Sequence, residues 1–192
     1  MLLVRLLDKK LKNMNANLYT TTIVPMMRTL ENLSRLLDAA VAFAATKKTD
    51  RLDFTEALLN DRLVFDQHPL IRQVQMACDS GKAAAARLSK QEPPSMPDTE
   101  KNADELKARI QKTLEFMKTV APEQVIGNEE VIITMPPYYK KQYGGEHLTG
   151  YEYATMYALP NFYFHATTAY AILRKNGVPI GKGDYLGQLP LQ

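Results

Sequence analysis

Apolar residues recur at intervals of three and four along most of this chain, and this spacing restricts the fold to packed amphipathic helices. The pattern covers residues 17–47, 69–89 and 102–121, and a fourth helical segment begins near Tyr151. In the first segment, Pro25 predicts a kink or a helix start because proline lacks an N–H donor. The first segment shows the spacing through Leu18, Ile23, Met26, Met27, Leu30, Leu33, Leu37, Ala40 and Val41.

Helix-ending and helix-starting residues separate these segments. The linker 91–97 contains three prolines and cannot be helical throughout. Asn102 and Glu105 have the spacing of a capping box, which predicts a helix start at Asn102. Asn176-Gly177 predicts the end of the last helix. A short helix is expected over residues 54–60, and Asp66 is expected in the cap region of the helix that starts near Pro69.

The pattern changes between the third and fourth long segments. Residues 129–135 include a β-branched run, and residues 146–150 follow a stretch that is rich in tyrosine and glycine. We expect a two-stranded hairpin with a long exposed tip, which must lie against the helices because such a ribbon is marginal alone. The predicted fold is therefore an all-α four-helix bundle with a small β-hairpin inserted before the last helix.

The composition is that of one globular domain. The chain has 192 residues, of which 45% are hydrophobic and 23% are charged. Its apolar runs are far shorter than the roughly 20 residues of a membrane span, so stable membrane insertion is not expected. Cys78 is the only cysteine and cannot form an internal disulfide, so we expect a cytoplasmic location.

The net charge of +3 has a local origin. Residues 1–13 hold four basic residues and one acidic residue, whereas the rest of the chain holds 20 of each. The body is therefore not expected to bind nucleic acid. We interpret residues 1–13 as an N-terminal extension of a domain over residues 14–192. A short amphipathic helix that contacts a membrane or a partner helix is the alternative.

Several well-known catalytic and cofactor motifs are absent from the sequence. The three histidines, His68, His147 and His165, form no HExxH motif, and there is no CxxC, phosphate-binding glycine loop or GxSxG. These absences exclude zincins, zinc fingers, P-loop and Rossmann proteins, and serine hydrolases. We expect His68 to lie at the surface or to cap the helix that starts near Pro69, His147 to lie at the surface, and Cys78 to be a core residue.

His165 is the leading candidate for chemistry. On a helix, Asn161 and His165 share the apolar face that should point into the bundle, and buried polar groups need partners. Two interpretations stay open: a hydrogen-bonded buried pair, or part of a pocket or metal site between helices. The segment 69–89 offers Gln75 and Asp79, one turn apart, and Gln73 near the other edge of the same face. Asp79 is a candidate metal ligand or base, or a solvated residue.

The aromatic residues of the last helix also leave two interpretations open. They either fill the core and one exposed face, or they line a pocket or a homodimer surface, since aromatic residues concentrate in both. The cluster consists of Tyr151, Tyr153, Tyr157, Phe162, Tyr163, Phe164 and Tyr170.

Together these segments resemble an uncharacterised bacterial and fungal family of the DinB/YfiT-like superfamily. The resemblance covers residues 18–187 and leaves residues 1–13 outside. It is most specific over residues 158–174, ALPNFYFHATTAYAILR. Further matching segments are residues 66–75, Ala77-Cys78-Asp79, Lys82, Arg87-Leu88, Thr149-Gly150, residues 176–179 and Gly181-Lys182.

The resemblance implies the same fold, a four-helix bundle with a hairpin before the last helix. The wider superfamily includes metal-dependent enzymes, among them thiol S-transferases. These hold a divalent metal with one histidine from the second helix and two histidines four residues apart on the last helix. Such a metal deprotonates a bound thiol or water near neutral pH.

This sequence departs from that metal-binding pattern. The last helix carries Asn161 and His165, and the resemblance makes Gln75 the equivalent of the histidine on the second helix. His165, Asn161 and Gln75 form a degenerate triad that is a poor site for zinc or nickel, because neutral amide oxygens are weak donors. Asp79 would supply the missing charge if it lay nearby.

Three functions therefore stay open. The first is a small-molecule pocket around His165, Asn161 and Gln75 without a strong metal site. The second is a divalent-metal-dependent enzyme, a thiol S-transferase or a hydrolase. The third is a structural or stress-related interaction protein whose polar core residues serve packing alone.

Overall fold

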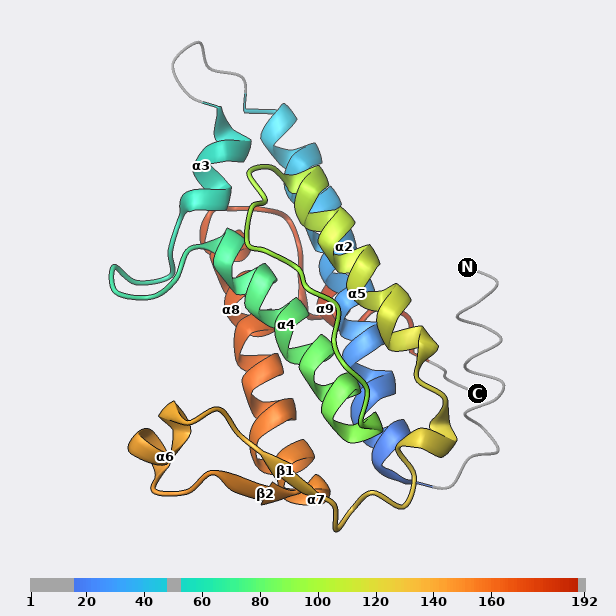
Figure 1. Cartoon of the computed structure of the whole chain (residues 1–192). Helices are drawn as coiled ribbons and strands as arrows, with labels where there is room; N and C mark the ends of the chain where they lie inside the picture. The colour runs from blue at the N-terminus through green and yellow to red at the C-terminus, as the bar shows by residue number, and fades with distance from the viewer. Residues whose placement is uncertain (1–15, 48–52, 190–192) are drawn as a thin grey trace.

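The computed structural model describes residues 16–47 and 53–189, and the predicted extension over residues 1–13 lies outside them. Four long helices, α2 (Val24–Ala45), α4 (Leu70–Ser89), α5 (Ala103–Thr119) and α8 (Leu159–Lys175), lie side by side as a bundle (Figure 1). Helix α4 packs against both α8 and α5, and α2 closes the bundle. The predicted all-α bundle with a small hairpin is confirmed.

Two of the long helices begin with a π-helical segment that ends beside a proline. The π segment η1 (Tyr19–Ile23) leads into α2, and η3 (Tyr153–Ala158) leads into α8. Pro25 and Pro160 each follow as the second residue of the α-helix. A proline ring clashes with the carbonyl four residues back, and the wider π turn relieves that clash. The elements α7 (Gly150–Glu152), η3 and α8 follow one another without interruption and form one helix over residues 150–175, here called the last helix.

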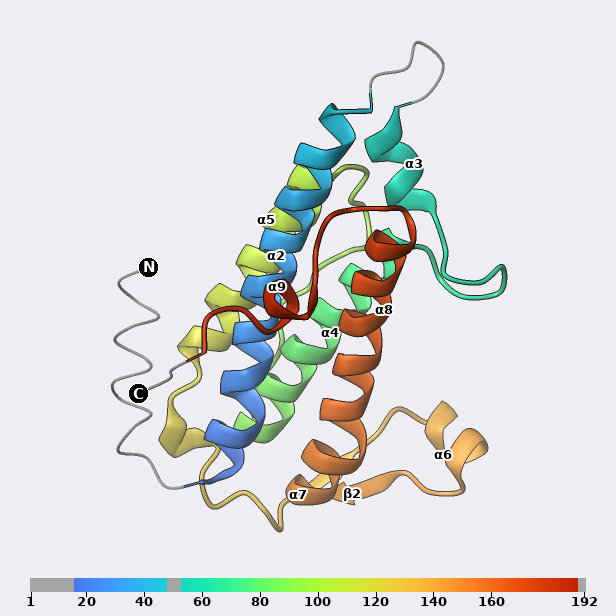
Figure 2. The same ribbon diagram turned by 180° about the vertical axis from the view of Figure 1, so that it is seen from behind.

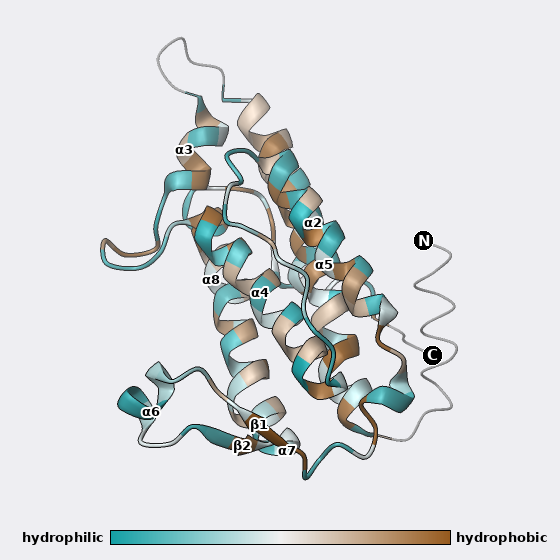
Figure 3. Cartoon of the chain, viewed as in Figure 1, coloured by the Kyte–Doolittle hydropathy of each residue, from teal (hydrophilic) through white to brown (hydrophobic). Residues whose placement is uncertain are grey.

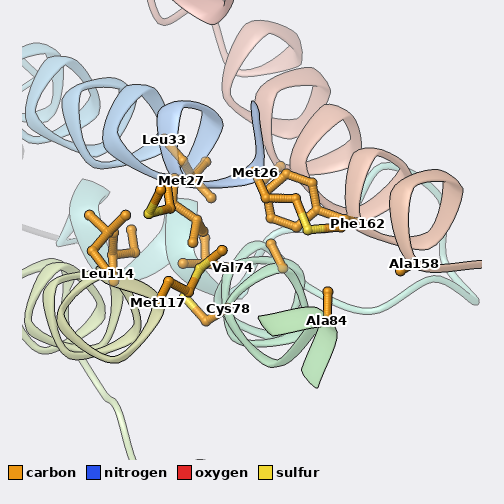
Figure 4. Packing of buried hydrophobic residues seen from close by; sticks show 14 of the residues in the cluster. Met26, Met27, Leu33, Val74, Cys78, Ala84, Leu114, Met117, Ala158 and Phe162 are labelled. Atoms are coloured by element: carbon orange, nitrogen blue, oxygen red, sulfur yellow. The ribbon is translucent and has the colours of Figure 1, made fainter. Parts of the chain in front are cut away.

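The core fills the space between the four long helices. Figure 4 shows Met26 from α2 beside Phe162 from α8, and Val74 from α4 near Met117 from α5. The Cys78 thiol is fully buried among these residues, and burial raises its pKa to about 12. Cys78 is therefore an inert core residue, as expected. Figure 3 shows the complementary pattern, with hydrophilic residues on the outward faces of the helices.

Capping residues account for several of the helix boundaries. The Asn102 side chain accepts a hydrogen bond of 2.9 Å from the Glu105 N–H, as the capping box predicted. Gly177 has φ +84°, and the Val178 N–H bonds the carbonyl of Leu173 at the end of α8. The short helix α3 (Phe54–Asn60) lies where it was expected.

The expected role of Asp66 at the start of α4 is wrong. Asp66 lies exposed in the preceding turn, and the residue that flanks the helix is Pro69. Pro69 has an extended backbone with ψ 167°, so the helix begins at Leu70 without a side-chain cap. The Leu70 N–H instead bonds the carbonyl of Asp61.

The hairpin consists of β1 (Ile132–Thr134) and β2 (His147–Thr149), which pair antiparallel. The 3₁₀ turn η2 (Pro122–Gln124) precedes β1 along the chain. The long tip between the strands folds as a short helix, α6 (Tyr138–Tyr143), which the sequence did not indicate. The hairpin lies beside the start of the last helix, and α6 projects from the bundle (Figures 1 and 2).

The C-terminal segment crosses the bundle. Helix α9 (Lys182–Leu186) lies over α2 (Figure 2), where the Asn32 amide donates a hydrogen bond of 2.9 Å to the Tyr185 carbonyl. Gly187 has φ +66°, and a Cβ atom there would lie 2.4 Å from Asn32 Oδ1. Only glycine fits this close approach. In the described part of the chain, no helix is both long and apolar enough to cross a membrane.

Candidate functional site

A groove with a volume of about 340 Å³ separates α4 from the last helix. One side is a stripe of α4 residues three or four positions apart, and the other side comes from η3 and α8. Residues that precede and begin α6 close the groove from the hairpin. The lining residues of this α4–α8 groove are Arg72, Met76, Asp79, Ser80, Ala83, Arg87, Pro136, Tyr138, Tyr139, Tyr153, Tyr157, Ala158, Asn161 and His165.

His165 is buried at one end of the groove, with 5% of its surface exposed. Its Nδ1 lies 2.8 Å from Gln73 Oε1, while Gln73 Nε2 donates a hydrogen bond of 3.0 Å to the His68 carbonyl. Because the amide nitrogen of Gln73 is used in this way, its oxygen is the acceptor and His165 Nδ1 carries the proton. Nε2 makes no hydrogen bond to any residue in the described ranges, so it is available as an acceptor in the groove.

The imidazole of His165 is neutral at physiological pH. Burial, followed by the nearby charges of His68 and Arg72, lowers its pKa to about 4. The group is therefore a hydrogen-bond acceptor and a weak base, and it is not a cation in the folded protein.

Asn161 is held one turn away on the same side of the groove. Its amide Nδ2 donates a hydrogen bond of 2.7 Å to Ser80 Oγ, and Ser80 donates in turn to the Met76 carbonyl at 2.8 Å. Asn161 and His165 are thus each hydrogen-bonded to α4, and the two side chains are not bonded to each other. Both also line the groove, so the buried-pair interpretation and the pocket interpretation describe the same residues.

The structure does not bring Gln75 to His165, and this part of the predicted grouping needs correction. Gln75 Nε2 donates to Glu100 at 2.8 Å, and its Oε1 accepts from Arg72 at 2.9 Å. Positions 73 and 75 lie about 200° apart around a helix, so only one of them can face α8. Gln73, which the sequence placed at the edge of this face, is the residue that contacts His165.

Asp79 lines the groove but is already engaged in ion pairs. Its carboxylate lies 2.9 Å from Arg109 and 3.1 Å from Lys82. Arg109, on α5, has a side chain that is only 1% exposed, and it also pairs with Asp98 at 2.9 Å and Glu100 at 3.0 Å.

Arg109 also donates hydrogen bonds to the carbonyls of Pro97 at 3.1 Å and Met96 at 3.3 Å, so one buried charge joins α4, α5 and the proline-rich linker. The sequence analysis did not identify Arg109, because helical spacing alone does not show whether position 109 is buried like its apolar neighbour Ile110. The acidic residues that follow the linker prolines were the available signal.

The donor set in the groove does not fit a resident zinc or nickel ion. His165 offers one free nitrogen, the oxygen of Gln73 is bonded to His165, and Asp79 is paired with Arg109. The guanidinium groups of Arg72 and Arg87 add positive charge to the lining. Within the described ranges, no three His, Cys, Asp or Glu side chains come together as metal ligands.

Arg87 occupies the opposite end of the groove. It donates a hydrogen bond of 3.2 Å to the Tyr153 hydroxyl and lies over the Tyr153 ring at 5.6 Å. Arg72 has an ion pair with Asp98, but Arg87 has no carboxylate partner among the described residues. The family resemblance included Arg87, but its chemistry was not apparent before Tyr153 and the groove were placed beside it.

The tyrosines form a connected chain along the groove. The ring centroid of Tyr139 lies 4.5 Å from that of Tyr138, 5.6 Å from that of Tyr143 and 5.3 Å from that of Tyr157. The ring centroids of Tyr157 and Tyr153 are 5.9 Å apart. The hydroxyls of Tyr139 and Tyr157 are hydrogen-bonded. The aromatic cluster therefore divides: Tyr153 and Phe162 are buried, Tyr157 lines the groove, and Tyr151 and Phe164 are exposed. His68 and His147 are exposed, as expected.

Comparisons with known proteins agree with this fold. A crystal structure described as a DinB family member from Shewanella denitrificans superposes with a TM-score of 0.82 at 43% sequence identity. The match covers 91% of this chain and 94% of the other. No curated protein matches the chain. The model of a domain of unknown function, DUF1993, matches residues 18–186. The chain therefore belongs to the DUF1993 family and has the helical-bundle fold of a DinB family member.

Proposed function

We propose that the protein binds an organic anion in the α4–α8 groove without a resident metal. The observation that carries this proposal is Arg87, a cation in the groove lining with no carboxylate partner among the described residues. A partly buried guanidinium without a counter-charge favours a negatively charged ligand, and its planar fork matches a carboxylate or a phosphate.

The charge of the rest of the groove supports the same ligand class. Among the described residues of the lining, Asp79 is the one acidic residue, and Arg109 and Lys82 offset its charge. At the other end, neutral His165 presents Nε2 as an acceptor. A ligand that reaches this end would place a hydroxyl or N–H group there. Arg87 and Gln73, the partner of His165, are 14 residues apart on α4, so the two ends are about 20 Å apart and such a ligand would be elongated.

Arg87→Gln tests the proposal directly. Organic carboxylates and phosphomonoesters are screened by the rise in melting temperature of the whole chain, and their affinities are measured by calorimetry. We expect Arg87→Gln to weaken the binding of a stabilising anion at least tenfold, because a charge-assisted bidentate contact is lost. Lys112→Gln makes the same charge change at an exposed position of α5 and serves as the matched control.

Two results would contradict the proposal. One is a panel in which no organic anion raises the melting temperature. The other is an equal loss of affinity in Arg87→Gln and Lys112→Gln, which would show that binding follows net charge.

The metal-dependent alternative has its own measurement. Elemental mass spectrometry is applied to tag-free protein purified without chelator, with His165→Ala measured beside it. We expect metal far below one ion per chain. About one ion per chain that His165→Ala removes would overturn the metal-free part of the proposal.

A further inference from the structure

A second cavity lies directly beside the groove. Its volume is about 290 Å³, and it lies between the hairpin, α6 and η3. The wall is formed mainly by apolar and aromatic side chains, with Glu146 and His147 as its polar members. The apolar and aromatic residues of this side pocket are Met135, Tyr139, Tyr143, Leu148, Met156 and Tyr157.

Tyr139 and Tyr157 line both cavities. Their hydroxyls are hydrogen-bonded to each other, so these two side chains form the partition between groove and side pocket. Tyr157 lies one helical turn from Tyr153, the partner of Arg87. The partition is therefore close to the Arg87 end of the groove.

Tyr139, one of the two side chains of the partition, belongs to an element that can move. Tyr139 belongs to α6, a six-residue helix carried at the tip of a two-stranded hairpin, whereas Tyr157 belongs to the last helix. A two-stranded ribbon is marginal alone, so displacing its tip costs little compared with moving a bundle helix. The groove and the side pocket can therefore become one space when Tyr139 moves away from Tyr157.

The two spaces differ in chemistry. Arg87 has no carboxylate partner among the described residues, whereas Met135, Met156 and Leu148 give the side pocket an adaptable apolar wall. Each space alone is near the lower limit of about 300 Å³ for ligand sites, and the two together fall well within the usual range.

We propose that groove and side pocket bind one amphipathic carboxylate, with its charged group on Arg87 and its hydrocarbon chain past Tyr139 and Tyr157 in the side pocket. This inference rests on the proposed binding of an organic anion and specifies its chemical class. The hydrocarbon chain of the ligand contributes affinity by burying methylene groups, and its carboxylate sets the orientation of the ligand.

The test is a chain-length series on the full-length protein. Calorimetry compares butanoate, hexanoate and octanoate, with 1-octanol as the uncharged probe. We expect affinity to rise about fourfold for each methylene that enters the side pocket. We expect 1-octanol to bind at least tenfold more weakly than octanoate, and Arg87→Gln to weaken all three carboxylates by a similar factor.

Met156→Glu places a carboxylate in the wall of the side pocket, at a residue that is 73% exposed and therefore tolerant of substitution. We expect this variant to bind butanoate normally and to lose the gain with chain length. Tyr151→Glu, at an exposed position of the last helix that lines neither space, should keep the gain. Melting temperatures of both variants verify the fold.

The possible failures are distinguishable. If short carboxylates bind through Arg87 but affinity does not grow with chain length, the inference is overturned and the proposed function stands. If the gain survives in Met156→Glu, the chain lies elsewhere and the inference is equally overturned. If no carboxylate binds at all, this inference falls with the carboxylate part of the proposed function, and phosphomonoesters alone test what is left.

Discussion

His165 shows how a single hydrogen bond decides the chemistry of a side chain. Gln73 Oε1 accepts a hydrogen bond from the Nδ1–H group, and burial keeps the ring neutral. Nε2 is therefore unprotonated, and can accept a hydrogen bond in the groove, at pH values above the lowered pKa of His165. Because helical spacing places His165 on a buried face, it needs a polar partner. That partner is Gln73 of α4.

This arrangement predicts a contribution of His165 to the pH dependence of stability. The pKa is about 4 in the folded protein and about 6.5 in the unfolded chain, so the unfolded chain takes up the proton first. The contribution is complete above pH 6.5 and decreases as the pH falls toward 4. We expect about 2 to 3 kcal/mol of unfolding free energy to be lost from this group.

Urea unfolding at pH 7.5, 6.5, 5.5 and 4.5 measures this loss, with His165→Gln as the comparison. Glutamine keeps an N–H donor for Gln73 but does not titrate. The variant should therefore lose less stability than the wild type across this window. Identical pH profiles for both proteins would show that His165 is not the titrating group.

At the scale of elements, the proline-rich linker is held to the bundle by Arg109. Burial alone would raise the pKa of the Glu100 carboxyl, yet hydrogen bonds from its own backbone, Arg109 and Gln75 hold that pKa below its ordinary value. The linker therefore remains paired with α5 and α4 through neutral pH. Its attachment is electrostatic, and helical spacing does not show it.

Arg109→Leu should be strongly destabilising. It leaves Glu100 poorly solvated without its cation, and it frees Asp79 and Asp98, which are more exposed. We expect a loss of about 2 to 3 kcal/mol in urea unfolding at pH 7, below the usual loss for fully buried pairs because two of the carboxylates reach solvent.

Lys112→Leu is the matched control, since it removes a cation from an exposed position of the same helix. It should change stability by less than about 0.5 kcal/mol. Equal effects of the two substitutions would mean that Arg109 is not the residue that attaches the linker.

The element boundaries were largely predictable from local chemistry. Asn102 and Gly177 act through their own backbone geometry, so their positions in the sequence suffice. The π turns before Pro25 and Pro160 were not predictable, because they depend on where the adjoining helices pack. Helix α6 escaped prediction because its six residues give no periodic pattern.

The site was less predictable than the fold. Asn161 and His165 follow from one helix face, but the choice between Gln73 and Gln75 depends on the rotation of α4 in the bundle. Arg87 emerges as a site residue only once Tyr153 is placed across the groove. The site features that were not predicted are therefore those that depend on contacts between residues far apart in the sequence.

For the whole molecule, the bundle and the hairpin should differ in local stability. The four long helices share one continuous core, whereas β1, β2 and α6 form a small ribbon at its side. In hydrogen exchange followed by mass spectrometry, we expect the amides of β1, β2 and α6 to exchange before those of α4 and α8.

Tyr139→Phe sharpens this prediction, because it removes the hydroxyl that bonds Tyr157. Exchange should accelerate in α6 and the strands and stay unchanged in α4. Uniform protection of helices and hairpin, or acceleration throughout the bundle, would show that the two parts open as one unit.

The long sequence separation across the groove has a consequence for synthesis on the ribosome. Gln73 and His165 are 92 residues apart, and Asn161 meets Ser80 across 81 residues. After α4 has been translated, roughly 5 to 15 seconds pass before α8 is complete. During that interval the face of α4 that packs against α8 lacks this partner. The groove is therefore among the last features of the described bundle to form.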